Sequence, residues 1–110
     1  MFVGTKGEGG GDLFELDYFG QKAYLSQTNQ MHLEATMFTF ERVYSLQPSF
    51  RAEKSRTRKH VTEFWHLEGE AAWVDNEQNM RIIENLITHI CHHVAKNCEQ
   101  ELKYLGQDPK

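Results

Sequence analysis

The 110-residue sequence contains only two cysteines, Cys91 and Cys98, in a stretch with helical periodicity. About two turns of helix, or roughly 10 Å, would separate them, which is too far for a disulfide bond. Free thiols suit a reducing compartment. The first residues also lack the charged region and apolar run of a signal peptide, so we expect a cytoplasmic protein.

Long apolar runs and an excess of positive charge are lacking as well. No apolar stretch approaches the roughly 20 residues that cross a bilayer, so we expect no membrane partner. The net charge of -4 argues against a generic polyanion binder. Any contact with nucleic acid must therefore come from a local basic cluster, and residues 54–59 form one.

The composition is that of a folded segment. Apolar residues make up 39% of the chain, and thirteen residues are aromatic (seven Phe, four Tyr and two Trp). The length suits one small domain with a single core, and we find no internal repeat, linker or low-complexity tract. We therefore expect residues 1–110 to belong to one domain.

The first half predicts a glycine-rich loop, a hairpin and a helix. Five of the eight glycines fall within residues 1–11, a pattern typical of a mobile loop that closes over a site. Residues 12–19 and 22–26 are strand-like around a turn at Gly20.

A helix is predicted to follow this hairpin. Thr28 or Asn29 can cap it, and it should end near residue 39. Its apolar positions Met31, Ala35 and Phe38 fall on one face, with Leu33 and Met37 beside it.

The second half predicts two strands and a long helix. Residues 42–51 and 61–74 are extended runs on either side of the basic loop, and Pro48 marks a bulge, an edge or a break. Asp75 and Gln78 form a variant of a capping box before a helix with apolar spacings of three and four residues, and Gly106 and Pro109 are stop signals at its far end. The fold class is therefore α+β, with a long C-terminal helix that covers one face of the sheet.

Residues 49–64 resemble motif 2 of the class II aminoacyl-tRNA synthetases, whose pattern is Phe-Arg-x-Glu, a variable loop, and then His and Phe. The spacing of Arg51, Glu53, His60 and Phe64 is similar to that of the aspartate, asparagine and lysine subgroup. Further similarity before motif 2 extends the resemblance over nearly the whole chain. It implies a partial catalytic domain, an antiparallel sheet flanked by helices, from which motif 1, motif 3 and the anticodon-binding domain are absent.

The resemblance implies that an amino acid is activated with ATP and then transferred to tRNA. Arg51 would bridge the carboxylate and the α-phosphate, a task that suits a permanently charged bidentate group. Glu53 would lie beside adenine, His60 would contact phosphate, and the Phe64 ring would stack on the base. The positions implied for ATP are Arg51, Ala52, Glu53, Lys59, His60, Val61 and Phe64. Without the resemblance, His60 is a loop histidine and Phe64 a core aromatic.

Amino-acid specificity depends on residues 27–34. Aspartate enzymes carry a lysine where this sequence has Leu33, and Glu34 follows it. A carboxylate substrate would be repelled there, whereas an amide could donate its NH2 group to Glu34, so the resemblance implies asparagine as substrate. The positions implied for the amino acid are Glu8, Gln30, Leu33, Glu34 and Arg51. As a solvated helix residue, Glu34 would carry no specificity.

The remaining partners are also implied by the resemblance. The basic loop would contact the acceptor stem of tRNA through Lys54, Arg56, Arg58 and Lys59, unless it is simply a solvated charge run. The family is homodimeric and uses Mg²⁺, whose ligands would lie mostly outside these 110 residues. We therefore expect negligible adenylation by this chain alone.

Three alternatives stay open at this point. An aspartate–tRNA ligase or an AMP-forming asparagine synthetase would share the catalytic core, and a non-catalytic synthetase-like fragment would bind tRNA or a protein partner. Two other signals are weak. His89, Cys91, His92 and His93 do not converge on one helix face, so we expect no metal site. The glycine-rich loop lacks the Lys-Ser or Lys-Thr of a phosphate-binding P-loop.

Overall fold

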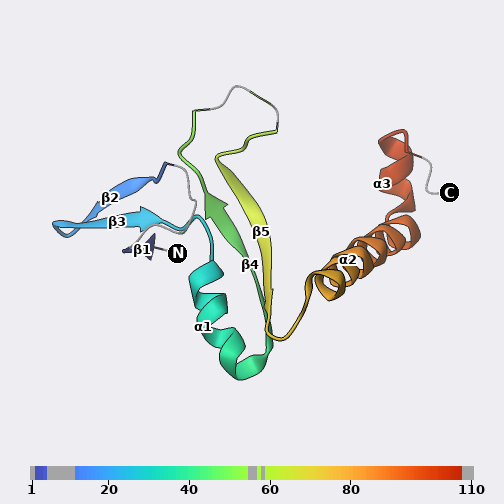
Figure 1. Ribbon diagram of the computed structural model, residues 1–110. Coiled ribbons are helices and arrows are strands. Elements are labelled where there is room, and N and C mark those ends of the chain that lie inside the picture. The colour runs from blue at the N-terminus through green and yellow to red at the C-terminus, as the bar shows by residue number, and fades with distance from the viewer. Residues whose placement is uncertain (1, 5–11, 55–56, 58, 108–110) are drawn as a thin grey trace. The chain divides into compact units, whose positions relative to one another are not determined.

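The structure is a computed structural model that describes residues 2–4, 12–54, 57 and 59–107. Its antiparallel strands and helices confirm the α+β class. Two compact units, Met1–Trp73 and Val74–Lys110, are described separately below. The elements, labelled in Figure 1, are β1 (Phe2–Val3), β2 (Glu15–Tyr18), β3 (Gln21–Leu25), α1 (Gln30–Phe40), β4 (Arg42–Phe50), β5 (Glu63–Ala71), α2 (Asn76–Asn97) and α3 (Glu99–Tyr104).

The predicted N-terminal hairpin is confirmed as the pairing of β2 with β3. Its turn contains Gly20 with φ of 78°, a left-handed conformation that glycine adopts without steric cost. The Gly20 N–H donates to Oδ1 of Asp17 at 2.7 Å. A third strand, β1, pairs antiparallel with β3 and was not predicted, because only two residues of the glycine-rich segment form it.

The second predicted hairpin is the β4–β5 ribbon, in which nine residue pairs run from Arg42 opposite Ala71 to Phe50 opposite Glu63. Pro48 pairs in register with Trp65, so it marks neither a bulge nor a break. Among the described residues β4 has a ladder partner on one side only, β5. The edge position, one of the three predicted possibilities, is therefore the correct one, because an edge strand tolerates a residue without an N–H.

The two faces of the ribbon differ in chemistry and in burial. One face, which we call the polar face, is partly or fully buried and carries Ser45, Gln47, Ser49, Phe64, His66 and Glu68. The opposite, apolar face carries exposed Tyr44, Leu46, Trp65 and Leu67. Because side chains alternate across a strand, residues 64, 66 and 68 share the face that helix α1 also contacts.

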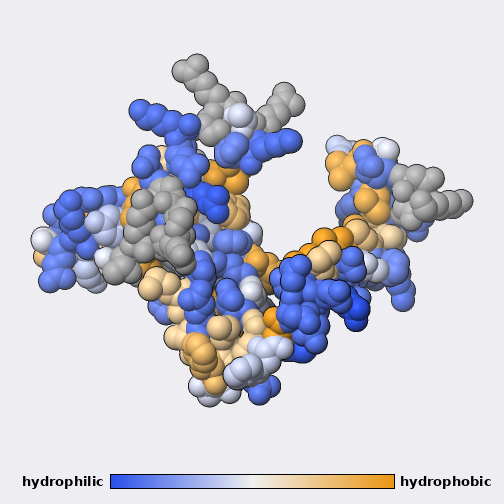
Figure 2. Space-filling view, in the orientation of Figure 1, coloured by the Kyte–Doolittle hydropathy of each residue, from blue (hydrophilic) through white to orange (hydrophobic). Residues whose placement is uncertain are grey.

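Helix α1 has the predicted limits, but the buried face differs from the prediction. Leu33 is the buried apolar residue of this helix at 5% exposure, whereas Met31 and Phe38 are 58% and 80% exposed. The expected face of Met31, Ala35 and Phe38 was wrong. Apolar residues lie all around this helix, so their spacing could not select the side that packs on the ribbon. Apolar surface over α1 is visible in Figure 2.

The second unit begins with the predicted capping box. The Gln78 N–H donates to Oδ1 of Asp75 at 2.8 Å, and the Asp75 N–H donates to Oε1 of Gln78 at 3.1 Å. The helix ends at Asn97, earlier than its stop signals indicated. At this end the Asn97 side-chain amide donates to the His93 carbonyl, and Cys98 leaves helical geometry. A separate helix, α3, follows, and Gly106 with φ of 70° lies just beyond it. No helix in the described part of the chain is both long and apolar enough to span a bilayer.

Candidate functional site

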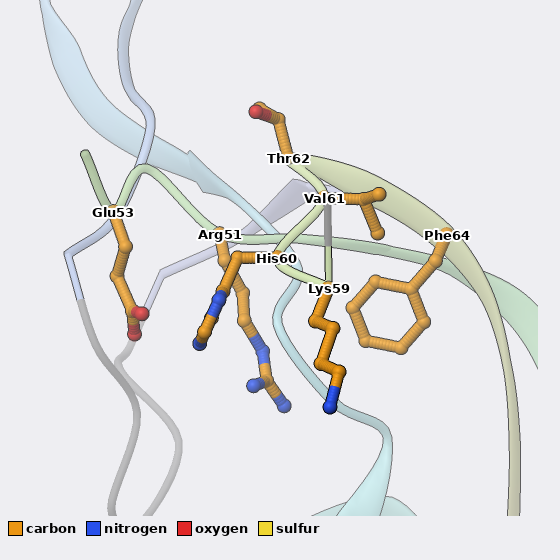
Figure 3. A pocket seen from close by; sticks show the side chains of 7 residues that line it. All are labelled: Arg51, Glu53, Lys59, His60, Val61, Thr62 and Phe64. Atoms are coloured by element: carbon orange, nitrogen blue, oxygen red, sulfur yellow. The ribbon is translucent and has the colours of Figure 1, made fainter. Parts of the chain in front are cut away.

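A pocket of about 310 Å³ lies where the β4–β5 ribbon opens into its connecting loop. Its size is at the lower end of the range for small-ligand sites. In Figure 3 the nitrogen-bearing ends of Arg51, Lys59 and His60 point the same way, with the Glu53 carboxylate on one side and the Phe64 ring on the other. The lining residues are Arg51, Glu53, Lys59, His60, Val61, Thr62 and Phe64.

Backbone hydrogen bonds hold the arginine strand in place. The Arg51 N–H donates to the Thr62 carbonyl at 2.9 Å, which continues the β4–β5 pairing by one step. The next N–H, of Ala52, donates to the Asp12 carbonyl at 2.9 Å. The loop therefore leaves the ribbon from a backbone that is fixed on both sides.

Arg51 and Phe64 face the same space. The guanidinium carbon Cζ lies 5.4 Å from the centroid of the ring, within the range of a cation–π contact. Arg51 is exposed and Phe64 is partly buried, so the ring forms a wall and the guanidinium remains free to meet a ligand. Since β4 and β5 pair antiparallel, alternation alone places both side chains on the polar face.

The chemistry of the pocket suits an anion that also carries a flat ring. Arg51 and Lys59 are two basic side chains, and an arginine can bind two oxygens of a phosphate or carboxylate at once. Phe64 offers a stacking surface, and Glu53 offers acceptors for the amino or imino groups of a base. The hydroxyl of Thr57 and Nδ1 of His60 are within hydrogen-bonding distance, which orients the imidazole.

Six of the seven positions predicted for ATP line this pocket. The exception is Ala52, whose backbone instead anchors the loop to Asp12. Thr62 lines the pocket and was not predicted, although its place two residues before Phe64 on the same strand face is a signal that could have found it.

Of the residues predicted to bind the amino acid, Arg51 lines the described pocket, whereas Gln30, Leu33 and Glu34 lie on α1 and do not line it. Nε2 of Gln30 donates to Oε1 of Glu34 at 2.8 Å, and both side chains are partly buried rather than directed into bulk water. The Leu33 side chain is buried, with 5% exposure. The position of Glu8 lies outside the described residues. The role of this segment in specificity stays a prediction.

The predicted tRNA contacts are only partly described. Lys54 and Lys59 are exposed, as a surface for phosphate groups requires. Arg56 and Arg58 fall outside the described residues.

A buried polar cluster on the ribbon was missed in the sequence. The Glu68 carboxylate, with its side chain 11% exposed, accepts hydrogen bonds from the Asn29 N–H at 2.8 Å and from the Thr28 hydroxyl. Nδ1 of His66 lies 3.7 Å from this carboxylate and 3.1 Å from the hydroxyl oxygen of Ser49. The alternation of Phe64, His66 and Glu68 was the available signal, although residues 61–74 were predicted only as an extended run.

Within the described part of the chain, no three His, Cys, Asp or Glu side chains converge on a point that could hold a metal ion. The rings of His89 and His93 are 6.2 Å apart on α2, as expected for side chains one helical turn apart. Among the described residues that line the pocket, Glu53 alone has a carboxylate.

An antiparallel ribbon that presents an arginine, a histidine and a stacking ring to one pocket matches the class of ATP-dependent synthetase that motif 2 implied. A family model for tRNA synthetases class II (D, K and N) matches residues 1–109, and the chain belongs to this family.

Relatives similar to the chain include several asparagine–tRNA ligases, and similar solved structures include asparaginyl- and aspartyl-tRNA synthetases. The chain is 49% identical over 110 residues to the asparagine–tRNA ligase of Thermoplasma acidophilum, with 100% of this chain and 26% of the relative covered. Identity to the asparagine–tRNA ligase of Thermococcus kodakarensis is 50% over 101 residues, covering 92% of this chain and 23% of the relative.

A solved structure is similar as well. The asparaginyl-tRNA synthetase from Pyrococcus horikoshii complexed with asparaginyl-adenylate has a TM-score of 0.87 and 50% identity, over 94% of this chain and 24% of that one. The chain thus spans about a quarter of the length of the proteins it matches.

Proposed function

We propose that this chain is the motif 2 part of an asparagine–tRNA ligase, and that residues 1–110 form part of its catalytic domain. The complete protein would join asparagine to ATP as asparaginyl-adenylate, release pyrophosphate, and transfer asparagine to tRNA. The observation that carries this proposal is the shared pocket of Arg51 and Phe64, whose charge and ring suit a nucleotide. Relatives of 49–50% identity that bear this name support the choice of amino acid.

In this proposal the pocket residues bind different parts of the substrates. Arg51 binds oxygens of the substrate carboxylate and the α-phosphate, so it neutralises the charge that develops at phosphorus. Phe64 stacks on adenine, and Glu53 accepts hydrogen bonds from the base. His60 and Lys59 contact phosphate oxygens from the loop.

We further propose that residues on α1 select asparagine. Leu33 provides no positive charge for a carboxylate side chain, and Glu34 offers an acceptor for an amide. The 2.8 Å hydrogen bond from Gln30 to Glu34 orients that acceptor. Glu8 would meet the α-ammonium group from the N-terminal segment.

The other predicted partners are also part of the proposal. Lys54 and Lys59, with Arg56 and Arg58, would contact the acceptor stem of tRNA, and two complete chains would form the homodimer. The described residues do not by themselves suit Mg²⁺, because no cluster of three suitable ligands exists among them. Magnesium would arrive with ATP and take its remaining ligands from segments of the complete protein. The two free cysteines fit a reducing cytoplasm.

A segment exchange tests the proposal. Residues 1–110 replace the matched segment of the Thermoplasma acidophilum ligase, and the hybrid is assayed for ATP–pyrophosphate exchange with asparagine and with aspartate. We expect exchange with asparagine only, and its loss in the Arg51→Ala hybrid. Exchange with aspartate, or an unaffected Arg51→Ala hybrid, contradicts the proposal.

The 110-residue chain alone provides a complementary measurement. Its described pocket lacks a second arginine for the terminal phosphate of ATP, so we expect negligible exchange. Strong asparagine-dependent exchange by the purified chain would refute the idea that it is an incomplete catalytic unit.

A further inference from the structure

The N-terminus of helix α1 is capped by a side chain from strand β5, which is distant in sequence. Asn29 occupies the N-cap position but makes no side-chain capping hydrogen bond. Its backbone N–H donates instead to Oε2 of Glu68 on β5, at 2.8 Å. The Gln30 N–H donates to Oγ1 of Thr28 at 3.0 Å, and the Thr28 hydroxyl donates to the same Glu68 carboxylate. Free N–H groups at a helix start favour such an anion.

Glu68 is itself held in one orientation. Its side chain is 11% exposed, and Nδ1 of His66 lies 3.7 Å from Oε1. His66 in turn contacts the hydroxyl of Ser49, a residue with 0% exposure, and its ring is 5.2 Å from the Phe64 ring. The carboxylate therefore connects the strand that carries the pocket wall to the first turn of α1.

That first turn carries the proposed amide-recognition pair. Gln30 is the first residue of α1, and its side-chain amide donates to Glu34 one turn later. If the first turn unwinds, Gln30 leaves helical geometry and this hydrogen bond is lost. The position of both side chains thus depends on the carboxylate that closes the helix.

A general stabilising role alone does not explain this arrangement. Burying a charge costs free energy unless it is hydrogen-bonded, and an apolar side chain here would leave the Asn29 N–H and the Thr28 hydroxyl without this acceptor. A carboxylate provides what an apolar side chain lacks, namely two directed acceptors that fix where the helix begins.

We propose that Glu68 is a positioning residue for amino-acid recognition, which fixes the first turn of α1 through Asn29 and Thr28 and so orients Gln30 and Glu34. The role of Gln30 and Glu34 in recognition rests on the proposed function. The anchoring of α1 by Glu68 does not, and it can be measured without any substrate.

The test uses the labelled 110-residue chain in solution NMR. Glu68→Ala and the nearly isosteric Glu68→Gln are compared with Glu70→Gln, a control on the same strand and the same face. Among the described residues, Glu70 makes no hydrogen bond or ion pair with α1. The readouts are hydrogen exchange of the Asn29 and Gln30 amides, the chemical shift of the Asn29 amide proton, and the side-chain NH2 resonances of Gln30.

We expect Glu68→Ala to speed exchange of these two amides by about tenfold or more, as loss of a hydrogen bond to a charged group predicts. The Asn29 amide proton should move upfield, and the Gln30 NH2 resonances should move to free-glutamine values. Glu68→Gln should show the same changes at smaller size, and the amides of the β4–β5 ladder should keep their exchange rates. Thr28→Ser should behave like the wild type and Thr28→Val should not, because only the hydroxyl is needed.

Two results would overturn the proposal. One is a Glu68→Gln chain whose Asn29 and Gln30 signals equal those of the wild type. The other is an equal change in Glu68→Gln and Glu70→Gln that extends over the ladder, since this would indicate a general loss of stability. If Glu68→Ala fails to fold, Glu68→Gln and the Thr28 pair decide the question. Neither result affects the segment-exchange test of the proposed function.

Discussion

Replacing Phe64 by leucine should weaken nucleotide binding selectively. The ring forms one wall of the pocket, and the Arg51 guanidinium carbon lies 5.4 Å from its centroid. Leucine keeps apolar bulk at this position, but it offers no π surface to adenine or to the guanidinium.

The size of the effect follows from these two contacts. Stacking of a base on an aromatic side chain is worth about 1–3 kcal/mol. An exposed cation–π contact such as that of Arg51 adds about 0.5–1 kcal/mol, part of which would be lost. Allowing for the bulk that leucine retains, we expect a loss of about 1.5–3 kcal/mol, which corresponds to a rise in Kd on the order of 10- to 100-fold.

NMR titration of the chain with a non-hydrolysable ATP analogue can measure this rise, because it detects weak binding. Trp65→Leu is the matched control, since Trp65 is the next residue, lies on the opposite face of the ribbon and is 71% exposed. Inorganic tripolyphosphate is the matched ligand, because it has no base to stack. It should lose far less affinity for the Phe64→Leu chain than the ATP analogue does.

The reasoning would be refuted by equal affinities of the wild type and Phe64→Leu for the ATP analogue. An equal loss in Phe64→Leu and Trp65→Leu would refute it as well, because the effect would then not depend on the face of the ribbon. The same holds if tripolyphosphate loses as much affinity as the analogue.

Three further predictions follow from packing, capping and charge. Leu33→Ala should lower the free energy of unfolding by about 2–4 kcal/mol in chemical denaturation, whereas Met31→Ala, at a position 58% exposed, should change it by less than about 0.5 kcal/mol. Asp75→Ala should destabilise the first turn of α2 by about 1 kcal/mol, seen as faster amide exchange there, and unchanged exchange relative to Asn76→Ala would contradict this. In a filter-binding assay of the hybrid ligase, Lys59→Ala should reduce the slope of log K against log salt for tRNA by about 0.7–0.9, and an unchanged slope would exclude a phosphate contact.

Elements whose signals lie within a few residues were predicted well. The turn at Gly20 and the capping box of Asp75 with Gln78 both depend on local hydrogen bonds and backbone angles. The pairing of β4 with β5 follows from two extended runs joined by one loop. These features required no knowledge of the rest of the chain.

The wrong predictions concern the face that helix α1 buries and the residue at which the long helix ends. Helix α1 has apolar residues on several sides, and contact with the ribbon selected Leu33 rather than Met31 and Phe38. The long C-terminal helix ends at Asn97, where Cys98 leaves helical geometry and the Asn97 side chain hydrogen-bonds to the His93 carbonyl. Gly106, which we took to end the long helix, lies beyond the separate helix α3 instead.

The sequence, through its resemblance to motif 2, predicted that Arg51 and Phe64 act at one nucleotide site. The register and alternating faces of the β4–β5 ribbon explain why both side chains line one pocket. Only the tertiary structure revealed that Glu68 closes the start of α1. Glu68 and Asn29 are 39 positions apart, and no local pattern specifies which N–H groups a carboxylate on a strand will meet. That contact arises where α1 packs on the polar face, and a single charged side chain there accepts hydrogen bonds from the Asn29 N–H and the Thr28 hydroxyl.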